Sequence, residues 1–427
     1  MIVVWGQGPR FFPGKSFLNR PKRKNPVLRT RLPTLPPAAR SRIALGLTAA
    51  AALGRFELQQ CGECGAVQYP PSEACHQCLS TNLKWKAQSG EAQILAETTL
   101  HHSNDLFFRE RLPWRLGLAK LDCGPTVVTH LHGGVRAAPS RVRVTARLDR
   151  AGQAVLVALP DKETPNMADD RQLREFTCDP KHRKILVTDG KSAVGQFLVK
   201  FFSGLNPEII WVGHTEPWKK FPGFDELKRI PQVTLLPLDV TDSKNVREVA
   251  AEIGGKVDIL VNNAEHHRAY GIGNRAGVET ARAEMDVNYF GLLRLAQEFA
   301  PAMRARGADG RSSAVAWVNL LSIYALANFP PHGTFSASKA AAHSLAQCLR
   351  AEMRPAGVRV VNVFPGPIDD EWNQLLPPPK LAPAALARAI AEALQQGVED
   401  VYPGDVAQEW LERWRDNPKA LEKELSS

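Results

Sequence analysis

The hydrophobic positions divide the chain into two regions that follow different patterns. From residue 184 onward, short continuous apolar runs such as KILV (184–187) and ILV (259–261) alternate with segments of helical periodicity. Apolar strands that alternate with helices are typical of a parallel sheet covered by helices on both faces. Residues 184–410 are therefore predicted to form an α/β, Rossmann-type, doubly wound parallel sheet, followed by a C-terminal helical tail at 411–427.

The region before residue 161 carries a β pattern. Short β-like runs lie between residues 86 and 160 and are separated by Gly, Asp and Pro. Strands at this spacing predict a small barrel or sandwich. An Ala- and Leu-rich stretch at 39–56 predicts a helix. The polar stretch 161–183, which Pro residues interrupt, is predicted to be the interdomain linker.

The positive charge of the protein is concentrated at its N-terminal end. The chain of 427 residues has a formal net charge of +10, and residues 1–56 contain eleven Lys and Arg but no Asp or Glu. The remainder is nearly neutral, with 43 basic and 44 acidic residues. Residues 1–38 form a basic, Pro-rich leader that is not expected to fold alone. The leader is compatible with a solvated tail or an over-extended gene start, with a transit peptide, or with a nucleic-acid-binding arm.

Hydropathy and cysteine usage narrow the expected compartment. No apolar run in the sequence reaches the roughly 18–20 residues that are needed to cross a bilayer. Of the seven cysteines, four lie together and three are scattered. That distribution does not resemble a disulfide framework in a chain of this length. We therefore expect a protein of the reducing cytoplasm, without a membrane partner.

The four clustered cysteines form two Cys-x-x-Cys pairs separated by ten residues. Two such pairs present four thiolates tetrahedrally, which predicts a structural zinc site. The metal would stabilise a segment too small to hold a core of its own, here residues 39–85, predicted to be a helix plus a zinc ribbon. A redox pair or a vestigial site is the alternative, and His76 beside the second pair is expected to be solvated. The expected metal ligands are Cys61, Cys64, Cys75 and Cys78.

The surroundings of these cysteines extend the pattern. With LQQCGECGAVQYPPSEACHQCLSTNLKW (58–85) and LPWRLGLAKLDCGPTVV (112–128), residues 39–160 resemble the zinc-ribbon and OB-fold family known as DUF35. The resemblance implies an OB-fold barrel at 86–160. It also implies an accessory, acyl-CoA-handling subunit that associates with thiolases, thiolase-like aldolases or hydratases.

An OB fold that binds single-stranded nucleic acid is the alternative for this barrel. That use needs stacking aromatic side chains in a basic groove. The candidates are the aromatic residues Phe107, Phe108 and Trp114, beside Arg109, Arg111 and Arg115. The stretch 101–115 is favoured instead as a partner- or CoA-facing loop, and nucleic acid is not the expected partner.

The second region carries a series of short motifs in a fixed order. They are ILVTDGKSAVGQ (185–196), LDV (238–240), VNNAE (261–265), MDVNYFG (285–291), NLLS (319–322) and PGPI (365–368). In this order and spacing, residues 184–410 resemble the short-chain dehydrogenase/reductase family, which has a Rossmann fold and a nicotinamide cofactor. The resemblance implies a cofactor-binding set of Thr188, Asp189, Gly190, Ala193, Gly195, Asp239, Asn262, Asn263, Ala264, Pro365 and Gly366. It implies a catalytic set of Asn288, Ser322, Phe335 and Lys339.

Departures from the family pattern weaken the expected cofactor site. The glycine turn of the family lets the backbone approach a pyrophosphate at a helix N-terminus. Here Asp189 and Ala193 replace two of its three glycines, and only Gly195 remains. A carboxylate about 5 Å from a phosphate charge costs about 3 kcal/mol at an effective dielectric of 20. Asp189 would alternatively cap the helix itself, and Glu265 adds a second negative charge where the family has Gly.

The expected chemistry departs in the same direction. In the family a Tyr exchanges the proton, Lys lowers its pKa and holds the ribose, Ser orients the carbonyl, and Asn anchors a water relay. Phe335 stands at the Tyr position and has no proton to give, although general acid–base catalysis is worth about 10²–10⁴-fold. Tyr324, two residues after Ser322, is the alternative source of a phenol. The joint departures favour a domain that retains neither cofactor nor chemistry.

The two long helices through which the family usually pairs correspond to residues 281–306 and 332–353, and both patterns are intact. Small residues in the second helix permit close packing. We expect a homo- or hetero-oligomer through these helices, formed with a second copy or with an active short-chain dehydrogenase. The alternative is that both are plain core helices.

Together these observations predict a multidomain chain in which a zinc ribbon and an OB-fold barrel precede the Rossmann domain. The expected function is that of an accessory or scaffold protein in acyl-CoA metabolism, beside a thiolase-like enzyme. Structural zinc is expected, and NAD(P) binding is not. The alternative function is an active NAD(P)-dependent short-chain oxidoreductase acting on a 3-hydroxy- or 3-oxoacyl-CoA or a similar carbonyl substrate.

Overall fold

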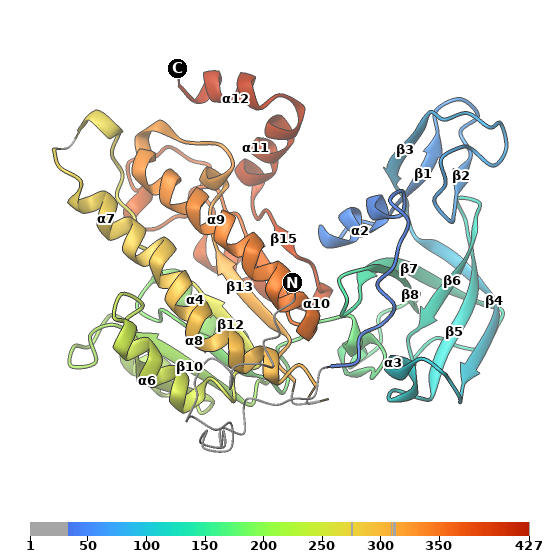
Figure 1. Cartoon of the computed structure of the whole chain (residues 1–427), viewed down its shortest axis with the longest axis horizontal. Coiled ribbons are helices and arrows are strands. Elements are labelled where there is room, and N and C mark those ends of the chain that lie inside the picture. Colours follow the sequence, from blue (N-terminus) through green and yellow to red (C-terminus); the bar gives the residue numbers. More distant parts are fainter. Residues whose placement is uncertain (1–32, 275, 309, 311–312, 427) are drawn as a thin grey trace, which may run out of the picture.

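The computed structural model describes residues 33–274, 276–308, 310 and 313–426. In Figure 1 the ribbon and the barrel lie on one side of the molecule and the larger α/β domain lies on the other. Most of the predicted basic leader falls outside the described residues. In the described part of the chain, no helix combines the length and the apolar character that a membrane span requires.

The first described helix packs against a small antiparallel sheet. Helix α2 (Leu45–Ala52) precedes β1 (Glu57–Cys61), β2 (Val67–Gln68) and β3 (Leu83–Ala87), which form a sheet in the order β2-β1-β3. The Trp85 indole of β3 lies against α2 at Gly46, where a Cβ atom would come within 2.2 Å of the ring. Glycine at this position therefore lets the helix lie directly on the ribbon.

Five strands close into the predicted barrel, which confirms the small β-barrel of the sequence interpretation. The barrel order is β4-β5-β6-β8-β7. The strands are β4 (Glu91–Leu100), β5 (Trp114–Leu121), β6 (Thr126–Leu131), β7 (Ser140–Leu148) and β8 (Ala154–Pro160), with the one-turn helix α3 (Leu106–Arg109) between β4 and β5. Buried and exposed residues alternate along β6 and β7, so period-two apolar positions fill the interior.

The segment predicted as an interdomain linker is folded against the barrel. It contains two short 3₁₀ turns, Met167–Asp169 and Leu173–Glu175. Leu173 and Phe176 are buried in one cluster with Trp114. The Gln172 side chain accepts from the Arg115 backbone N–H at 3.0 Å and donates to its carbonyl at 2.7 Å. Residues 167–176 are therefore part of the barrel's packing and not a free tether.

The α/β domain is a seven-stranded sheet in the order β11-β10-β9-β12-β13-β14-β15, with every neighbouring pair parallel. The strands are β9 (Lys184–Val187), β10 (Ile209–His214), β11 (Val233–Pro237), β12 (Ile259–Asn262), β13 (Ala316–Leu320), β14 (Arg359–Val363) and β15 (Asp400–Val401). Side chains alternate between the two faces: Ile185 and Val187 join one core and Leu186 joins the other. Both faces are apolar, which explains the continuous hydrophobic runs.

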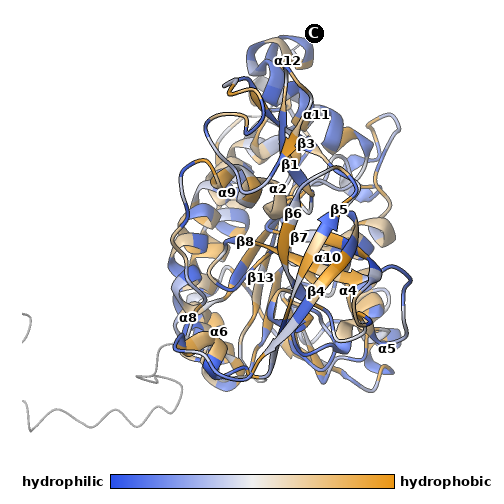
Figure 2. Cartoon of the chain, turned by 90° about the vertical axis from the view of Figure 1, so that its right-hand side faces the viewer, coloured by the Kyte–Doolittle hydropathy of each residue, from blue (hydrophilic) through white to orange (hydrophobic). Residues whose placement is uncertain are grey.

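Helices cover both faces of this sheet, which confirms the doubly wound arrangement (Figures 1 and 2). Residues of α4 (Ala193–Ser203), α5 (Phe224–Lys228) and α10 (Pro383–Gln396) pack on one face. Residues of α6 (Ser243–Ile253), α8 (Leu292–Ala305) and α9 (Gly333–Met353) pack on the other. Helix α7 (Glu279–Met285) continues into α8 through a π-helical turn at Asp286–Gly291.

The chain ends in two further helices, α11 (Asp405–Asp416) and α12 (Pro418–Leu425). The predicted start of the tail, residue 411, falls inside α11. Ala407 and Leu411 of α11 are buried in a cluster with Tyr324 and Phe335. Helix α11 thus covers one side of the α/β domain and packs on Phe335, which stands at the position of the family's Tyr.

Candidate functional site

The four cysteines converge at one end of the ribbon. Their Sγ atoms all lie within 4.8 Å of one another, with Cys61 3.5 Å from Cys78 and Cys64 3.5 Å from Cys75. The backbone N–H groups of the residues two positions after Cys61 and Cys75 donate to those sulfurs at 3.4 Å. Four thiolates at this separation fit a tetrahedral zinc ion. His76 is exposed on the ribbon and contacts Ser72, in agreement with the solvated position expected of it.

The turn after β9 lies at the carboxyl edge of the sheet, where parallel sheets bind ligands. The Ser192 side chain caps α4 and accepts from the Gly195 N–H at 3.2 Å. The alternative that Asp189 caps this helix is therefore wrong. Asp189 instead accepts from the Lys191 N–H at 2.9 Å, so two donors of the turn bond side chains of the chain itself. Burial raises the pKa of the Asp189 carboxyl.

Gly195 is the glycine that the packing of this turn requires. A Cβ atom there would lie 1.9 Å from the Asp189 carbonyl oxygen. Asn263, directly after β12, fixes the same turn, because its side chain donates to the Asp189 carbonyl at 2.6 Å and accepts from the Asp189 N–H at 3.0 Å. These contacts hold the strand–turn–helix unit together whether or not a ligand is bound.

The remaining predicted cofactor residues line the same edge. The Thr188 hydroxyl accepts from the N–H groups of Asn263 and Ala264 at 3.0 and 3.1 Å and donates to Asn262. Asp239 follows β11 and accepts from both the N–H and the hydroxyl of Thr241.

The other predicted glycines and the PGPI segment lie close to packed neighbours. A Cβ at Gly190 would meet the Val212 side chain at 2.2 Å, and one at Gly366 would lie 3.0 Å from Val406 of α11. Ala193 is the first residue of α4, and the Pro365 carbonyl accepts from the Ile323 N–H at 2.9 Å. The structure therefore brings the predicted cofactor residues together around one edge of the sheet.

Lys339 forms an ion pair with a residue of its own chain. Its side chain is buried, and Nζ lies 2.6 Å from the Glu265 Oε2 atom and donates to the Leu320 carbonyl at 2.9 Å. Glu265 follows β12 and stands where the family pattern has Gly. The Glu265 carboxylate is thus paired with the ammonium group that, by the family resemblance, would bind the ribose.

Phe335 lies in an apolar and aromatic environment. Its side chain is 2% exposed, and its ring stacks on the His267 ring at a centroid distance of 3.8 Å. His267 Nε2 is in hydrogen-bonding contact with His332 Nδ1. Burial lowers the pKa of His267 to about 2 and that of His332 to about 4, so both imidazoles are neutral at pH 7.

Tyr324 offers no accessible phenol in place of the missing one. Its side chain is 2% exposed and its ring packs on Phe329 and Trp410. Its hydroxyl has no hydrogen-bond partner among the described residues. Burial raises the pKa of Tyr324 above its usual value, which is opposite to the shift that an activated acid–base group near neutral pH requires.

The other two catalytic positions are engaged in structural hydrogen bonds. Asn288, in the π-helical turn, donates to the His266 carbonyl at 2.9 Å and to Ser338 Oγ at 2.8 Å. Ser322 Oγ donates to the Pro365 carbonyl at 3.4 Å and accepts from the Tyr324 N–H. All four residues predicted as a catalytic set are within one region of the fold, and each contacts other groups of the chain itself.

Sequence reasoning missed three titratable neighbours of this region. No motif of the family contains His267, His332 or Asp370. The only hint in the sequence was the pair His266–His267 directly after Glu265. Burial and the nearby Glu265 carboxylate raise the pKa of Asp370 to about 6. The region therefore combines two carboxyl groups, a lysine and two neutral histidines around a benzene ring.

The aromatic residues of the barrel do not form an exposed stacking surface. Phe107 and Trp114 are each 2% exposed and pack edge to face with Phe108. Arg111 pairs with Glu175 at 3.0 Å and Arg115 pairs with Glu97 at 2.7 Å. The stretch 101–115, favoured as a partner- or CoA-facing loop, contains α3 and packs against residues 167–176 through Phe107, while Leu106 and Arg109 are exposed.

Comparison with known proteins matches each part of the chain to a family. The family model described as short chain dehydrogenase matches residues 183–379. Those described as ChsH2, rubredoxin-like zinc ribbon domain, and ChsH2, C-terminal OB-fold domain, match residues 48–84 and 85–153.

The similar proteins are dehydrogenases of one family. Dehydrogenase/reductase SDR family member 7C of Xenopus tropicalis is 30% identical over 241 residues, covering 54% of this chain and 73% of that protein. Short-chain dehydrogenase PC-15 of Penicillium crustosum is 33% identical over 207 residues, covering 46% and 71%. A short chain dehydrogenase of Burkholderia cenocepacia J2315, solved in complex with NADP, is 32% identical with a TM-score of 0.53 and covers 58% of this chain and 99% of that one.

These matches confirm the resemblances stated for both parts of the sequence. The zinc ribbon, the OB-fold barrel and the Rossmann domain are each matched by a family in the order in which the structure shows them. The chain belongs to the short-chain dehydrogenase/reductase family through its C-terminal half, to which a ChsH2-type zinc ribbon and OB-fold domain are fused.

Proposed function

We propose that this protein is a cytoplasmic accessory or scaffold protein of acyl-CoA metabolism. In this proposal the zinc-ribbon and OB-fold module binds a thiolase-like enzyme. The Rossmann domain has lost hydride transfer and pairs with itself or with an active short-chain dehydrogenase. The observation that carries the loss of activity is the 2.6 Å ion pair between Lys339 and Glu265.

The ion pair opposes cofactor binding energetically. A ribose hydroxyl would have to replace the Glu265 carboxylate at a buried ammonium group. A hydrogen bond from the ammonium to a hydroxyl contributes about 1.5–3 kcal/mol net, whereas breaking a buried ion pair costs about 3–5 kcal/mol. Asp189 opposes the pyrophosphate as well, because its carboxylate uses a donor of the turn. Phe335 supplies no proton to a substrate that reaches the site.

A fluorescence titration tests the loss of cofactor binding. The chain has nine Trp residues that report on binding. Since each 1.4 kcal/mol weakens affinity tenfold, we expect NADH and NADPH to bind with dissociation constants of about 1 mM or weaker. The double variant Asp189→Gly, Glu265→Gly serves as the matched control and is expected to bind more tightly. Micromolar binding to the unmodified protein would overturn the proposal.

The position of the N-terminal module limits how a substrate would pass between partner enzymes. Arg359, at the amino end of β14, bonds backbone carbonyls of the barrel. The cofactor-edge residues lie at the opposite, carboxyl ends of the strands. A 3-oxoacyl-CoA released by a thiolase-like partner would therefore be delivered to a paired dehydrogenase subunit, not to this chain's own Rossmann edge.

An active NAD(P)-dependent oxidoreductase acting on a 3-hydroxy- or 3-oxoacyl-CoA is the second candidate function. The observation that favours it is the 32% identity with a short chain dehydrogenase that was solved with NADP. Ser322, Asn288 and Lys339 are also present. Turnover of an acyl-CoA substrate together with micromolar cofactor binding in the same titration would establish this function.

A further inference from the structure

The N-terminal module is docked on one edge of the Rossmann sheet. β15 is the last strand of that sheet, and β14 is its only strand neighbour in the described fold. The Glu399 N–H, directly before β15, donates to the Ala52 carbonyl at the end of α2 at 2.8 Å. Arg147 of β7 donates to the Gln396 carbonyl at the end of α10. Two segments of the N-terminal module therefore bond backbone groups of residues 396–399, which lead into the edge strand.

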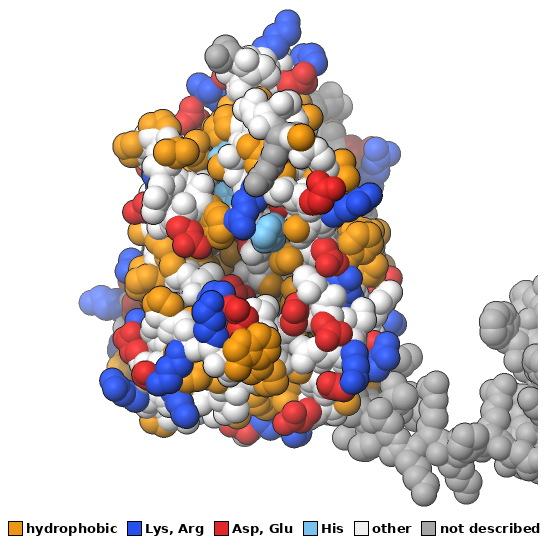
Figure 3. All heavy atoms as spheres, turned by 90° about the vertical axis from the view of Figure 1, so that its left-hand side faces the viewer, with side chains coloured by type: hydrophobic (Ala, Val, Ile, Leu, Met, Phe, Trp, Pro, Cys, Tyr) orange, Lys and Arg blue, Asp and Glu red, His pale blue; other side chains and the backbone are white. Residues whose placement is uncertain are grey.

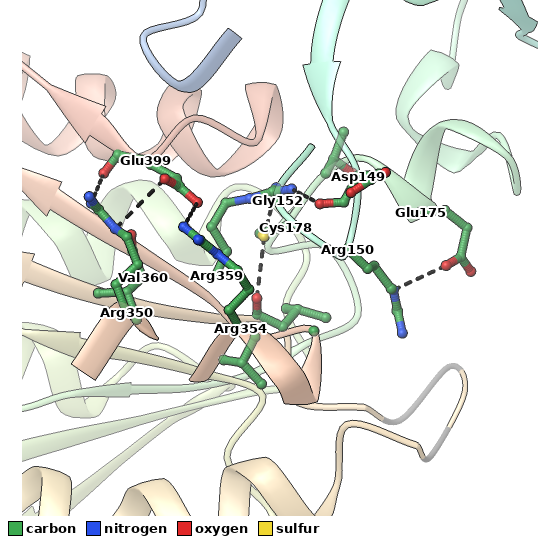
Figure 4. Close-up of a pocket in the computed structure, with 14 residues that line it drawn as sticks. Asp149, Arg150, Gly152, Glu175, Cys178, Arg350, Arg354, Arg359, Val360 and Glu399 are labelled. Atoms are coloured by element: carbon green, nitrogen blue, oxygen red, sulfur yellow. Dashed lines mark hydrogen bonds and ion pairs between the residues drawn. The ribbon is translucent and has the colours of Figure 1, made fainter. Parts of the chain in front are cut away.

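An arginine of β14 also joins the N-terminal module to the Rossmann domain, because it reaches from the sheet to the barrel. The Arg359 guanidinium donates to the Leu148 and Asp149 carbonyls of the barrel at 2.8 and 3.3 Å, and to the Phe176 carbonyl at 3.4 Å. Arg150 of the barrel pairs with Glu175 at 3.1 Å. Figure 4 shows these side chains converging from the barrel, from residues 167–178 and from the sheet.

The contact between the two halves is closely packed. Gly397 adopts φ 70° at the end of α10, and a Cβ there would lie 2.3 Å from the Phe176 carbonyl oxygen. The cavity at the centre of the contact measures about 20 Å³, room for about one water molecule. Leu53 and Arg55 also line the groove of about 400 Å³ that follows β15. The module therefore forms one wall of the space beside β15, through Leu53 and Arg55.

An exposed sheet edge is a ready template for pairing with another chain, and proteins cover such edges with other elements. We propose that the fused module is a built-in occupant of the β14–β15 edge, which leaves the α7–α9 face as the surface that the Rossmann domain offers to a partner subunit. The number of Rossmann domains in a particle is then limited to two. The pairing across α7–α9 rests on the proposed function, whereas the occupation of the β15 edge does not.

Cleavage of the full chain tests the occupation of the edge. Residues 161–166 are all exposed, so a recognition sequence for a specific protease is placed there in the full-length protein. After cleavage we expect the two fragments to remain together in gel filtration. Separation of the fragments without any further change would overturn the proposal.

Single variants identify the contacts that hold the fragments. Arg147→Ala leaves the Rossmann fragment unchanged and is expected to weaken the association of the cleaved fragments roughly tenfold or more, as is Arg359→Ala, since each loses charged hydrogen bonds. Arg141→Ala is the matched control, because that side chain is 48% exposed and pairs with Asp122 within the barrel. An effect of Arg141→Ala equal to that of Arg147→Ala would contradict the assignment.

Light scattering of the uncleaved protein tests the limit on assembly. We expect particles with at most two Rossmann domains at every concentration of the uncleaved protein. Particles with four Rossmann domains in the unmodified protein would overturn the proposal. If the unmodified protein stays monomeric and pairs with no dehydrogenase, the proposed function is contradicted. The cleavage experiment would still decide whether the module occupies the edge.

Discussion

At the scale of single residues, the departures from the family pattern have been absorbed into a packed structure. Glu265 gives Lys339 a partner, Phe335 lies between His267 and an apolar cluster, and Asp189 bonds its own turn. None of these replacements leaves a buried charge without a partner. The altered site is therefore stable by its own contacts.

Glu265→Gln tests the strength of the buried ion pair. Removing one partner of a buried pair costs about 3–5 kcal/mol, and because Glu265 is 17% exposed we expect the lower end, about 3 kcal/mol, in the free energy of unfolding. The control is Glu216→Gln, whose pair with Lys191 is exposed and is expected to contribute less than about 1 kcal/mol. Equal effects of the two variants in denaturant unfolding would contradict this account of Lys339.

The two neutral histidines predict a loss of stability in acid. Their pKa values in the folded protein lie below the ordinary value of about 6.5, so the unfolded chain binds the protons more tightly. Stability is therefore complete above pH 6.5 and falls as the pH drops toward 4, by about 1.4 kcal/mol per pH unit for each histidine. Asp370, whose pKa is raised to about 6, acts in the opposite sense between pH 6 and 4.

Denaturant unfolding at pH 6.5 and 5.5 measures this dependence. His332→Phe removes one of the two imidazoles and is expected to lessen the loss between the two pH values by about 1 kcal/mol. His101→Gln changes an exposed residue and should leave the loss unchanged. A His332→Phe protein that loses as much stability as the unmodified one would show that His332 does not titrate in this range.

At the scale of elements, the short ribbon depends on neighbours and on its metal ligands. Its three strands contain only twelve residues, too few for an independent core. Helix α2 fastens it to the rest, because its Gly46 lies on Trp85 and its Thr48 hydroxyl accepts from the Ala154 N–H of β8 at 3.2 Å. A local change in the ribbon is therefore expected to spread to α2 first.

Cys64→Ser tests the metal site. We expect elemental analysis to find one zinc ion per chain in the unmodified protein and none in the variant, because a structural site with three thiolates binds zinc far more weakly. Amide exchange should become faster across residues 57–87. Cys348→Ser, on the exposed side of α9, is the control and should keep the metal. A Cys64→Ser protein with full zinc content would exclude this ligand set.

At the scale of the whole molecule, the two surfaces proposed for association are an edge and a face of the same sheet. The barrel and ribbon lie beside the β15 edge, whereas α8 and α9 cover one face of the sheet (Figures 1 and 2). Figure 3 shows the end of the molecule that lies away from the barrel, where apolar surface is interrupted by charged side chains. Val278 and Phe290 are 53% and 44% exposed and line an apolar pocket of about 540 Å³ with Ala281 and Met285. This face has the character of a subunit interface.

Phe290→Glu tests association through this face. A charge in the centre of an apolar interface is left without a partner, so we expect the particle mass in light scattering to fall from two chains to one. Binding to an active dehydrogenase in a pull-down should be lost as well. Phe197→Glu, on the exposed side of α4, is the control. An unchanged mass for Phe290→Glu would remove α7–α9 as the pairing surface.

The sequence determined the order and type of the domains because those depend on short-range patterns. Two Cys-x-x-Cys pairs specify a ribbon whatever lies around them, and period-two and continuous apolar runs specify the barrel and the parallel sheet. The sequence alone also showed that Phe335 lacks a hydroxyl and that Asp189 brings a carboxylate, because each depends on a single position of a motif.

Only the tertiary structure decided what those residues contact. Lys339 meets Glu265 because α9 and the end of β12 are brought together by the sheet, and no spacing rule predicts that encounter. Residues 167–176 belong to the linker that the polarity of 161–183 predicts. They pack on the barrel because Leu173 and Phe176 lie in one buried cluster with Trp114. The covered edge at β15 arises from contacts between segments far apart in the chain. Such contacts depend on the relative position of folded elements, which local composition does not encode.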